Sequence, residues 1–269
     1  IRDSGKPLLW LCDFGFSKIF ARPESSRCTT RVWTLDKKNK RNWTAPEVSN
    51  PLESPEYSRS ADVWSLGCVI YFLASEGCAL FQNIASAESF NDDEKVLQRH
   101  DVHKKYPLLF DLISRMIKRV PDRRIRMEDA VFHPATQSWK EIASVITLFV
   151  ESYQAGGVQA VAAMETLERM NSQGRLTGND WTVHFEMEDI ASLERHQERQ
   201  FSMGERRSIR HLLVATRNLL AHISNRTVGM MVVTNEDLRA ALARRVAVSF
   251  PGILPALFDC NRAMSQWTM

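Results

Sequence analysis

One apolar run, residues 60–73, constrains the fold of this chain more than any other stretch of its sequence. It opens with Ser60-Ala61-Asp62-Val63-Trp64 and then carries apolar side chains at most positions through Leu73. A helix that is apolar nearly all round has no face that favours water, so it has to be buried. The run therefore predicts a buried helix.

The composition favours a folded chain of two domains over one. Hydrophobic residues make up 44% of the 269 residues, which is enough to bury a real core. The five cysteines lack the spacing of a metal site or a CxxC motif, which favours a reducing, cytosolic compartment. The sequence shows no signal peptide and no run of about 18 apolar residues. We therefore expect no membrane contact by this segment itself.

Four motifs occur in a fixed order along the first half of the chain. They are Asp13-Phe14-Gly15, Ala45-Pro46-Glu47, the start of the apolar run at Ser60, and Val120-Pro121-Asp122-Arg123-Arg124. In this order they resemble the DFG, APE, central-helix and D-P-x-x-R motifs of protein kinases. His133-Pro134 follows, as at the end of many kinase domains. The resemblance implies the C-terminal lobe of a kinase over residues 1–137.

This resemblance implies a role for four residues. Asp13 would reach the Mg²⁺ ion that bridges the phosphates of ATP. Asp62 would fasten the catalytic loop, and Glu47 would form a buried ion pair with Arg124. The sequence contains no glycine-rich loop, no strand lysine and no H-R-D catalytic loop. We therefore expect ATP with Mg²⁺, or ADP, only in an intact parent, and no phosphotransfer by this chain alone.

A polar stretch, residues 22–41, lies between the first two motifs and is rich in Ser, Thr, Lys and Arg. Its composition predicts a mobile loop that could accept phosphate. The candidate acceptors are Ser25, Ser26, Thr29 and Thr30. For any single one of them, a plain solvated loop is the alternative interpretation.

The second half, residues 138–269, is predicted to be an all-α domain. Helical periodicity or composition marks six segments, which are residues 139–153, 158–170, 186–200, 206–225, 235–246 and 250–264. No repeat or low-complexity segment occurs among them. The whole chain is therefore predicted to be mainly α.

The segment 206–225 has two different faces when it is read as a single helix. One face is apolar, and the opposite face carries Arg207, His211, Asn218 and His222. No Asp or Glu occurs between Glu205 and Glu236, so no acidic residue lies among the arginines of this segment. Such a face favours phosphate binding, and a solvated basic helix with incidental histidines is the alternative.

A kinase lobe followed by such a helical domain resembles one family. This family comprises the ER stress-sensor kinase/endoribonucleases (the inositol-requiring enzyme) and ribonuclease L, whose nuclease part is the KEN domain. The matching segments, in chain order, are Leu167-Glu168-Arg169, Asp180-Trp181, Arg210-His211-Leu212-Leu213, Arg217-Asn218, His222, Phe250-Pro251 and Arg262-Ala263-Met264. The resemblance extends over essentially the whole chain.

The resemblance implies RNA cleavage without a metal ion or any other cofactor in the ribonuclease site. The 2′-hydroxyl would attack the adjacent phosphorus and leave a 2′,3′-cyclic phosphate and a free 5′-hydroxyl. Arg217 matches the phosphate-binding arginine of the family, Asn218 the structural or orienting asparagine, and His222 the general acid. The reaction needs a cation on the phosphate oxygens and an acid for the leaving oxygen, and these residues supply both.

One residue of the family pattern is missing. The stress sensors carry a catalytic tyrosine that aligns near Gly204, and this chain has no tyrosine after Tyr153. His211 shares a face with His222 and is the tempting replacement. Eleven residues of unbroken helix would separate the two by about 16 Å, too far to act on one phosphate. Only a helix break, or His211 from a second subunit, would give it a catalytic role.

Three hypotheses follow from the sequence. The first is a metal-independent endoribonuclease that cleaves RNA in stress signalling or mRNA processing. It would be controlled by a serine/threonine kinase or pseudokinase domain and by self-association into dimers or higher oligomers. Its location would be the cytosol, or the cytosolic face of the ER membrane if the parent is a stress sensor. The second is a catalytically degenerate, RNA-binding scaffold with a pseudokinase domain. The third is an ordinary serine/threonine kinase with an unrelated helical tail.

Overall fold

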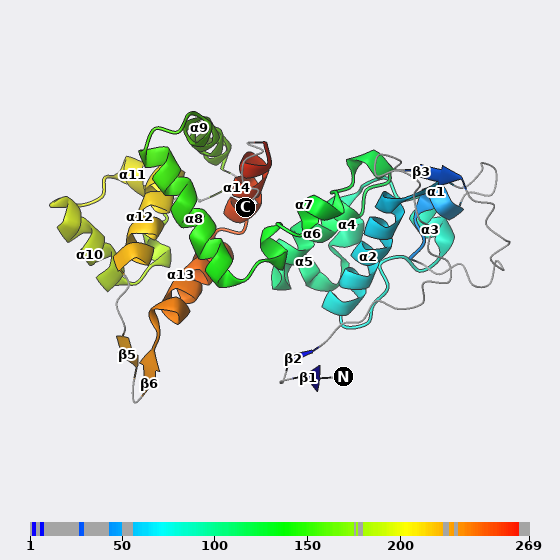
Figure 1. Ribbon diagram of the computed structural model, residues 1–269, viewed down its shortest axis with the longest axis horizontal. Helices are drawn as coiled ribbons and strands as arrows, with labels where there is room; N and C mark the ends of the chain where they lie inside the picture. The colour runs from blue at the N-terminus through cyan, green and yellow to red at the C-terminus, as the bar shows by residue number, and fades with distance from the viewer. Residues whose placement is uncertain are drawn as a thin grey trace.

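The computed structural model describes most of the chain beyond the first motif (Figure 1). The described residues are 2–3, 6–7, 27–29, 43–49, 56–174, 176, 180–222, 226–228 and 231–263. Asp13 lies outside the described residues, so its expected contact with Mg²⁺ stays a prediction. Helices dominate the described residues, and the prediction of a mainly helical chain is confirmed.

The first half contains seven helices among the residues that the structure describes. They are α1 (Pro46–Ser49), α2 (Arg59–Ala74), α3 (Ile84–Glu88), α4 (Glu94–Leu97), α5 (Val102–Lys105), α6 (Pro107–Met116) and α7 (Met127–Ala130). Two short antiparallel strand pairs also occur in this half. Strands β1 (Arg2–Asp3) and β2 (Lys6–Pro7) form one pair, and β3 (Arg27–Thr29) and β4 (Glu56–Ser58) form the other.

Strand β3 corrects part of the prediction of a mobile loop over residues 22–41. The pairing of β3 with β4 places Cys28 opposite Tyr57 and Thr29 opposite Glu56. This part of the loop is ordered because its backbone hydrogen bonds are satisfied by a strand that follows later in the chain. Ser25, Ser26 and Thr30 lie outside the described residues.

Helix α2 is the predicted central helix, and its inner side is densely packed. Trp64 and Tyr71 are fully buried, and the Trp64 ring stacks on Phe81 with centroids 5.4 Å apart. Gly67 sits where α2 crosses the end of α6. A Cβ atom at position 67 would lie 2.9 Å from the Cβ atom of Met116 and 2.9 Å from the Cδ1 atom of Ile117. The two helices approach closely there because position 67 has no side chain.

The prediction that α2 is buried on all sides is wrong for its outer side. Leu66 and Val69 are each 38% exposed, and Leu73 is 68% exposed. Helix α6 packs against α2 at Gly67, where Met116 and Ile117 approach most closely. The three exposed side chains show that the apolar composition of α2 overstated its burial.

The second half contains seven helices and one hairpin among its described residues. They are α8 (Trp139–Gln154), α9 (Val158–Ser172), α10 (Met187–Gln197), α11 (Met203–Arg207), α12 (Ile209–His222), β5 (Arg226–Val228), β6 (Met231–Val233), α13 (Asn235–Ser249) and α14 (Ile253–Ala263). The prediction of an all-α second half missed the β5–β6 hairpin, which is antiparallel. The hairpin was missed because each of its strands has only three residues.

The single helix predicted over residues 206–225 is instead two helices. Ser208 has an extended backbone, with φ −86° and ψ 129°, and it separates α11 from α12. The Ser208 backbone takes part in the start of α12, because the Leu212 N–H donates to the Ser208 carbonyl. Helix α12 then continues without a break from Ile209 to His222.

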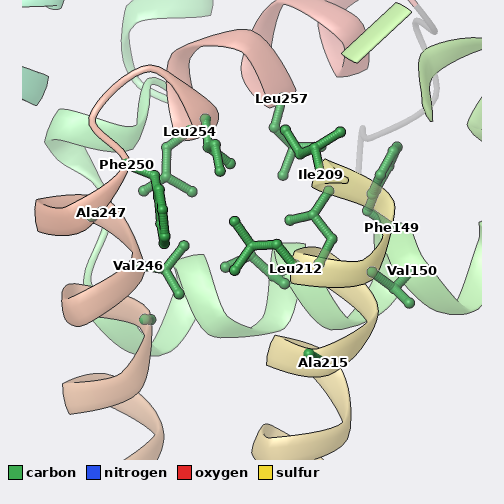
Figure 2. Packing of buried hydrophobic residues seen from close by; sticks show 14 of the residues in the cluster. Phe149, Val150, Ile209, Leu212, Ala215, Val246, Ala247, Phe250, Leu254 and Leu257 are labelled. Carbon is green, nitrogen blue, oxygen red and sulfur yellow. The ribbon is translucent and has the colours of Figure 1, made fainter. Parts of the chain in front are cut away.

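One large apolar core holds the second half together (Figure 2). Figure 2 shows Ile209 and Leu212 of α12 facing side chains from three other helices. These partners are Phe149 and Val150 of α8, Val246 and Ala247 of α13, and Leu254 and Leu257 of α14, with Phe250 between the last two helices. The apolar face of α12 is buried in this core, which leaves its other face for chemistry.

Helix α14 returns to the first half and links the two cores. Arg115 of α6 donates to Asp259 of α14 through both terminal nitrogens, Nη1 to Oδ1 at 2.5 Å and Nη2 to Oδ2 at 3.0 Å. Its guanidinium also lies 5.6 Å from the ring centre of Phe258. The imidazole of the fully buried His133 lies 5.1 Å from the Phe258 ring, centroid to centroid. Charged and aromatic contacts therefore fix α14 against the first half.

No single helix among the described residues is long and apolar enough to span a membrane. Only α13 and the first part of α14, a pair bent by 100°, meet the requirements of length and composition together.

Candidate functional site

A buried ion pair closes the lobe around α2. Arg124 donates to both carboxylate oxygens of Glu47, at 2.6 Å from Nη1 to Oε1 and at 2.8 Å from Nη2 to Oε2. The Arg124 side chain is fully buried, and its guanidinium lies 5.0 Å from the ring centre of Trp64. Further bonds from Arg124 to the carbonyls of Lys118, Ser60 and Arg119 satisfy the remaining three donors. A buried charge of this kind is tolerated only because it is paired and fully hydrogen-bonded.

Asp62, the third residue of the kinase resemblance that the structure describes, has a different environment. It lies in the first turn of α2 and its side chain is exposed. The structure brings Glu47 and Arg124 together but leaves Asp62 at the surface.

Arg217 lies on α12 and holds the position that the sequence assigns to phosphate binding. Its Nη2 donates to Oε1 of Glu151 on α8 at 3.0 Å, and its Nη1 donates to Oδ1 of Asn218 at 3.3 Å. Its Nε is buried, and no acceptor among the described residues lies within hydrogen-bonding distance of it. The Arg217 side chain is 27% exposed, and Glu151 is 46% exposed. The guanidinium is thus partly held in place, with one donor free and one bound to an exposed carboxylate.

His222 is the last residue of α12, and its side chain lies outside the described part of the structure. Its backbone position is one helical turn beyond Asn218, so the two residues share one side of the helix. The structure therefore places the backbones of Arg217, Asn218 and His222 within two turns of one continuous helix.

His211 lies near the opposite end of α12 in a separate network. Its Nδ1 lies 2.9 Å from the Ser208 hydroxyl, and its Nε2 lies 3.2 Å from a Glu205 oxygen. Because α12 is unbroken between His211 and His222, the separation of about 16 Å expected from helix geometry stands. His211 joins α11 to α12, and this contact gives it a structural role.

Glu205 anchors that network. Its carboxylate accepts two hydrogen bonds from Arg199, at 2.8 Å and 2.6 Å, and one from the Ser202 backbone N–H. The Arg199 guanidinium, and then the Ser202 groups, hold the pKa of Glu205 far below its ordinary value. This carboxylate therefore stays ionised and remains an acceptor for His211.

Gly204 stands near the position of the tyrosine in the resembling family, and it lies inside α11. A Cβ atom built at this position would meet only the Ser202 hydroxyl, at 4.0 Å. The position is therefore open to a larger side chain.

The sequence did not predict two contacts of this surface. They are the ion pair of Arg217 with Glu151 and the contact of Arg210 with the Tyr153 ring. The partners are far apart in sequence, so no local pattern links them.

No group of three or more His, Cys, Asp or Glu side chains arranged for a metal ion occurs in the described part of the chain.

A helical lobe centred on α2 and closed by the Glu47–Arg124 pair has the features of a kinase C-terminal lobe. The family model described as Protein kinase domain matches residues 1–135. This match spans half of the chain, and the chain belongs to the protein kinase family.

Curated serine/threonine kinases are among its relatives. Serine/threonine-protein kinase PLK4 of Drosophila sechellia is 25% identical over 63% of this chain and 21% of its own length. Mitogen-activated protein kinase 10 of Arabidopsis thaliana is 27% identical over 50% of this chain and 39% of its own length. A SNF-related serine/threonine-protein kinase of Rattus norvegicus is 33% identical over 48% of this chain and 16% of its own length. The chain thus spans less than half the length of these relatives.

Proposed function

We propose that residues 138–269 are a KEN-type endoribonuclease domain that cleaves RNA without a metal ion. The observation that carries this proposal is Arg217, whose guanidinium faces an exposed carboxylate at a position suited to an oxyanion. Phosphate and carboxylate both accept the parallel donors of a guanidinium. An RNA phosphate would therefore replace Glu151 as the acceptor of Nη2.

The proposed reaction uses the 2′-hydroxyl of RNA as its nucleophile. A bond forms between the 2′-oxygen and phosphorus, the bond from phosphorus to the 5′-oxygen breaks, and the 2′-hydroxyl proton passes to solvent water. Arg217 would stabilise the negative charge that develops on the non-bridging oxygens. His222 would protonate the leaving 5′-oxygen, and Asn218 would orient Arg217 through the hydrogen bond between their side chains.

The kinase lobe would control this activity in a longer parent. Under this proposal, ATP with Mg²⁺ or ADP binds the intact kinase domain, and self-association into a dimer or higher oligomer assembles the nuclease. The parent would act in the cytosol, or at the cytosolic face of the ER membrane, in stress signalling and mRNA processing. The contacts of Arg115 and Phe258 between α6 and α14 support such control, because they make the position of the second half depend on the first.

A degenerate, RNA-binding scaffold is the second candidate function. The observation that favours it is Gly204, which leaves the tyrosine position of the resembling family without a side chain. A pocket that has lost this group would keep the arginines for binding RNA and lose the rate of cleavage.

Cleavage of a stem-loop RNA in excess EDTA tests the nuclease proposal. The protein is assayed at concentrations where it self-associates, and the products are examined for 2′,3′-cyclic phosphate ends. We expect cleavage by the wild-type protein, and a fall in rate of about 10²–10⁴ for His222→Ala because positioned acid catalysis contributes that much. The exposed His196 on α10 supplies the matched control, and His196→Ala should cleave at the wild-type rate.

The scaffold predicts a different result in the same assay. It would bind the RNA without cutting it, and His222→Ala would leave that binding unchanged. Intact RNA in the presence of self-associated wild-type protein would overturn the nuclease proposal.

A further inference from the structure

We infer that Arg210 and Tyr153 form a platform on which a base of single-stranded RNA stacks beside Arg217. The Arg210 guanidinium carbon lies 5.8 Å from the centre of the Tyr153 ring. This inference rests on the proposed function, because it assigns a substrate-binding role next to the proposed cleavage site. It adds a contact with a nucleobase, whereas the arginines alone indicate only contacts with phosphate.

The two members of the platform differ in exposure. Tyr153, near the end of α8, is partly buried and packs against the core of the second half. Arg210, in the first turn of α12, is exposed. The Arg210 guanidinium carbon lies over the Tyr153 ring, and the Arg210 side chain is exposed to solvent. An open, planar cation supported from below by an aromatic ring is suited to stacking on a nucleobase.

The backbone beneath Arg210 is firmly held. Its N–H donates to Oε1 of Glu168 on α9 at 2.9 Å, and the neighbouring Ser208 hydroxyl donates to the same oxygen at 2.5 Å. These bonds fix the first turn of α12 against α9. The guanidinium therefore projects from an anchored turn, which lowers the entropy cost of holding it in one place.

The spacing of Arg210 and Arg217 fits one RNA strand. They are seven residues apart on α12, which is two helical turns, or about 10 Å, along the same side. Both contact residues near the end of α8, Arg210 through Tyr153 and Arg217 through Glu151. A strand that follows this side of α12 would place a phosphate on Arg217 and a nearby base on Arg210.

Glu151 is the acidic group that faces this surface from α8. It is 46% exposed, and Arg217 is its partner. An incoming phosphate would replace the Glu151 carboxylate as the partner of Arg217. The freed carboxylate would then point into solvent, and no buried hydrogen bond would be lost. The surface is therefore paired in the absence of RNA and can become basic when RNA displaces Glu151.

Binding of a fluorescent, single-stranded RNA made entirely of 2′-O-methyl nucleotides tests the platform. Such RNA has no free 2′-hydroxyl and is not cleaved, so fluorescence anisotropy reports binding alone. We expect Arg210→Ala to weaken binding roughly tenfold, because one stacked base is lost. We also expect it to lower the slope of log affinity against log salt by about 1, because one cation is lost.

Two further substitutions separate stacking from charge. Arg210→Lys keeps the cation and should keep the salt slope, yet it should bind several times more weakly because an ammonium group is not planar. Tyr153→Leu should weaken binding through loss of the supporting ring, and Tyr153→Phe should bind as the wild type does. Arg244, an exposed arginine of α13, is the control, and Arg244→Ala should bind as the wild type does.

An abasic oligomer with the same number of phosphates completes the test. It should bind the wild-type protein about tenfold more weakly than the base-bearing RNA. Equal binding of the two oligomers, or wild-type binding by Arg210→Lys, would overturn the platform and leave an ordinary phosphate contact. Equal displacement of the RNA by an acidic peptide and by unlabelled RNA would also overturn it.

The outcomes for the platform and for the nuclease can be told apart. If unmodified RNA is cleaved while the Arg210 and Tyr153 variants bind normally, the platform is overturned and the nuclease stands. If base-bearing RNA binds through Arg210 and is not cleaved, the platform stands and the nuclease is overturned. If the wild-type protein binds no RNA, both are overturned.

Discussion

Single residues of α11 and α12 carry the proposed chemistry, and their roles depend on partners from other helices. Arg217 is held by Glu151 of α8, while His211 is held by Glu205 of α11. His211 is tied into a network at the start of α12, and only His222 is assigned to the proposed reaction. Gly204 has no side chain that could take the role of base or orienting group, which the tyrosine fills in the resembling family.

Gly204→Tyr tests whether that unfilled role limits the reaction. Position 204 has open space, because only the Ser202 hydroxyl would lie within 4.0 Å of a new Cβ atom. We expect the rate of RNA cleavage to rise by about 10²-fold, the lower end of what a positioned acid–base group contributes. The measurement is the single-turnover rate in EDTA, where binding and product release do not limit the signal.

Gly204→Phe is the control for this substitution, since it adds the ring without the hydroxyl. It should cleave no faster than the wild type. An equal rise in rate for both variants would point to a packing effect and would contradict a chemical role for the tyrosine hydroxyl.

At the scale of elements, the crossing of α2 and α6 decides the packing of the first half. Gly67 lets the two helices touch, and the side chains of Ile113 and Ile117 fill the core on either side of the contact. Glycine lowers the helix propensity of α2 by roughly 1 kcal/mol relative to alanine. The close approach explains why a glycine is present in the middle of a long helix.

Gly67→Ala should therefore destabilise the protein, although alanine is the better helix former. The new Cβ atom would lie 2.9 Å from the Cβ atom of Met116, which is fixed to the backbone and cannot move aside alone. Overpacking of this kind costs about 1–3 kcal/mol, which exceeds the gain in propensity. Urea unfolding followed by circular dichroism measures the change.

Gly204→Ala is the matched control, because that glycine is also helical but has open space around it. It should leave the free energy of unfolding unchanged or raise it by up to about 1 kcal/mol. If both alanine variants had the same effect, helix propensity would explain the result and close packing at Gly67 would not.

For the whole molecule, the contact between α6 and α14 determines how the two halves are joined. The Arg115 guanidinium bridges Asp111 of its own helix and Asp259 of α14. Burial by itself would raise the pKa of Asp111, but the bonds from His133 and Arg115 outweigh it, so the pKa lies below its ordinary value. Asp111 thus stays charged in the folded state. Its contribution to stability is complete above an unfolded pKa of about 3.9 and is lost as the pH falls through the lower, folded value.

Asp259→Asn should loosen this junction. It replaces a carboxylate that accepts two bonds from Arg115 with a neutral amide, while Asp111 keeps the guanidinium paired. Because Asp259 is 51% exposed, we expect a loss of only about 1 kcal/mol in the free energy of unfolding. Amide hydrogen exchange should accelerate in α14 more than in α13.

The pair between Lys140 and Glu236 provides the control, since it joins α8 to α13 within the second half and both side chains are exposed. Glu236→Gln should leave both the free energy of unfolding and the hydrogen exchange in α14 unchanged, because an exposed ion pair contributes little. Faster exchange in α14 for both variants would mean that the Arg115–Asp259 contact is not specific to the junction.

The sequence alone determined those features that depend on local pattern. Periodicity predicted α8 and α9 to within two residues at either end. The resemblance of the ordered motifs to protein kinases implied that Glu47 and Arg124 would pair across the first half. Such features can be read from sequence because a helix face repeats every turn and a motif has a fixed length.

Only the tertiary structure decided which polar groups meet around α12 and between α6 and α14. The partners of Arg217 and Arg210 lie on α8, the partner of Arg115 lies on α14, and the outer side of α2 is left exposed in spite of its apolar residues. These contacts join residues that are tens of positions apart, so no local pattern encodes them. They follow from the way the apolar faces of α8, α12, α13 and α14 pack into one core, which fixes the polar faces as a consequence.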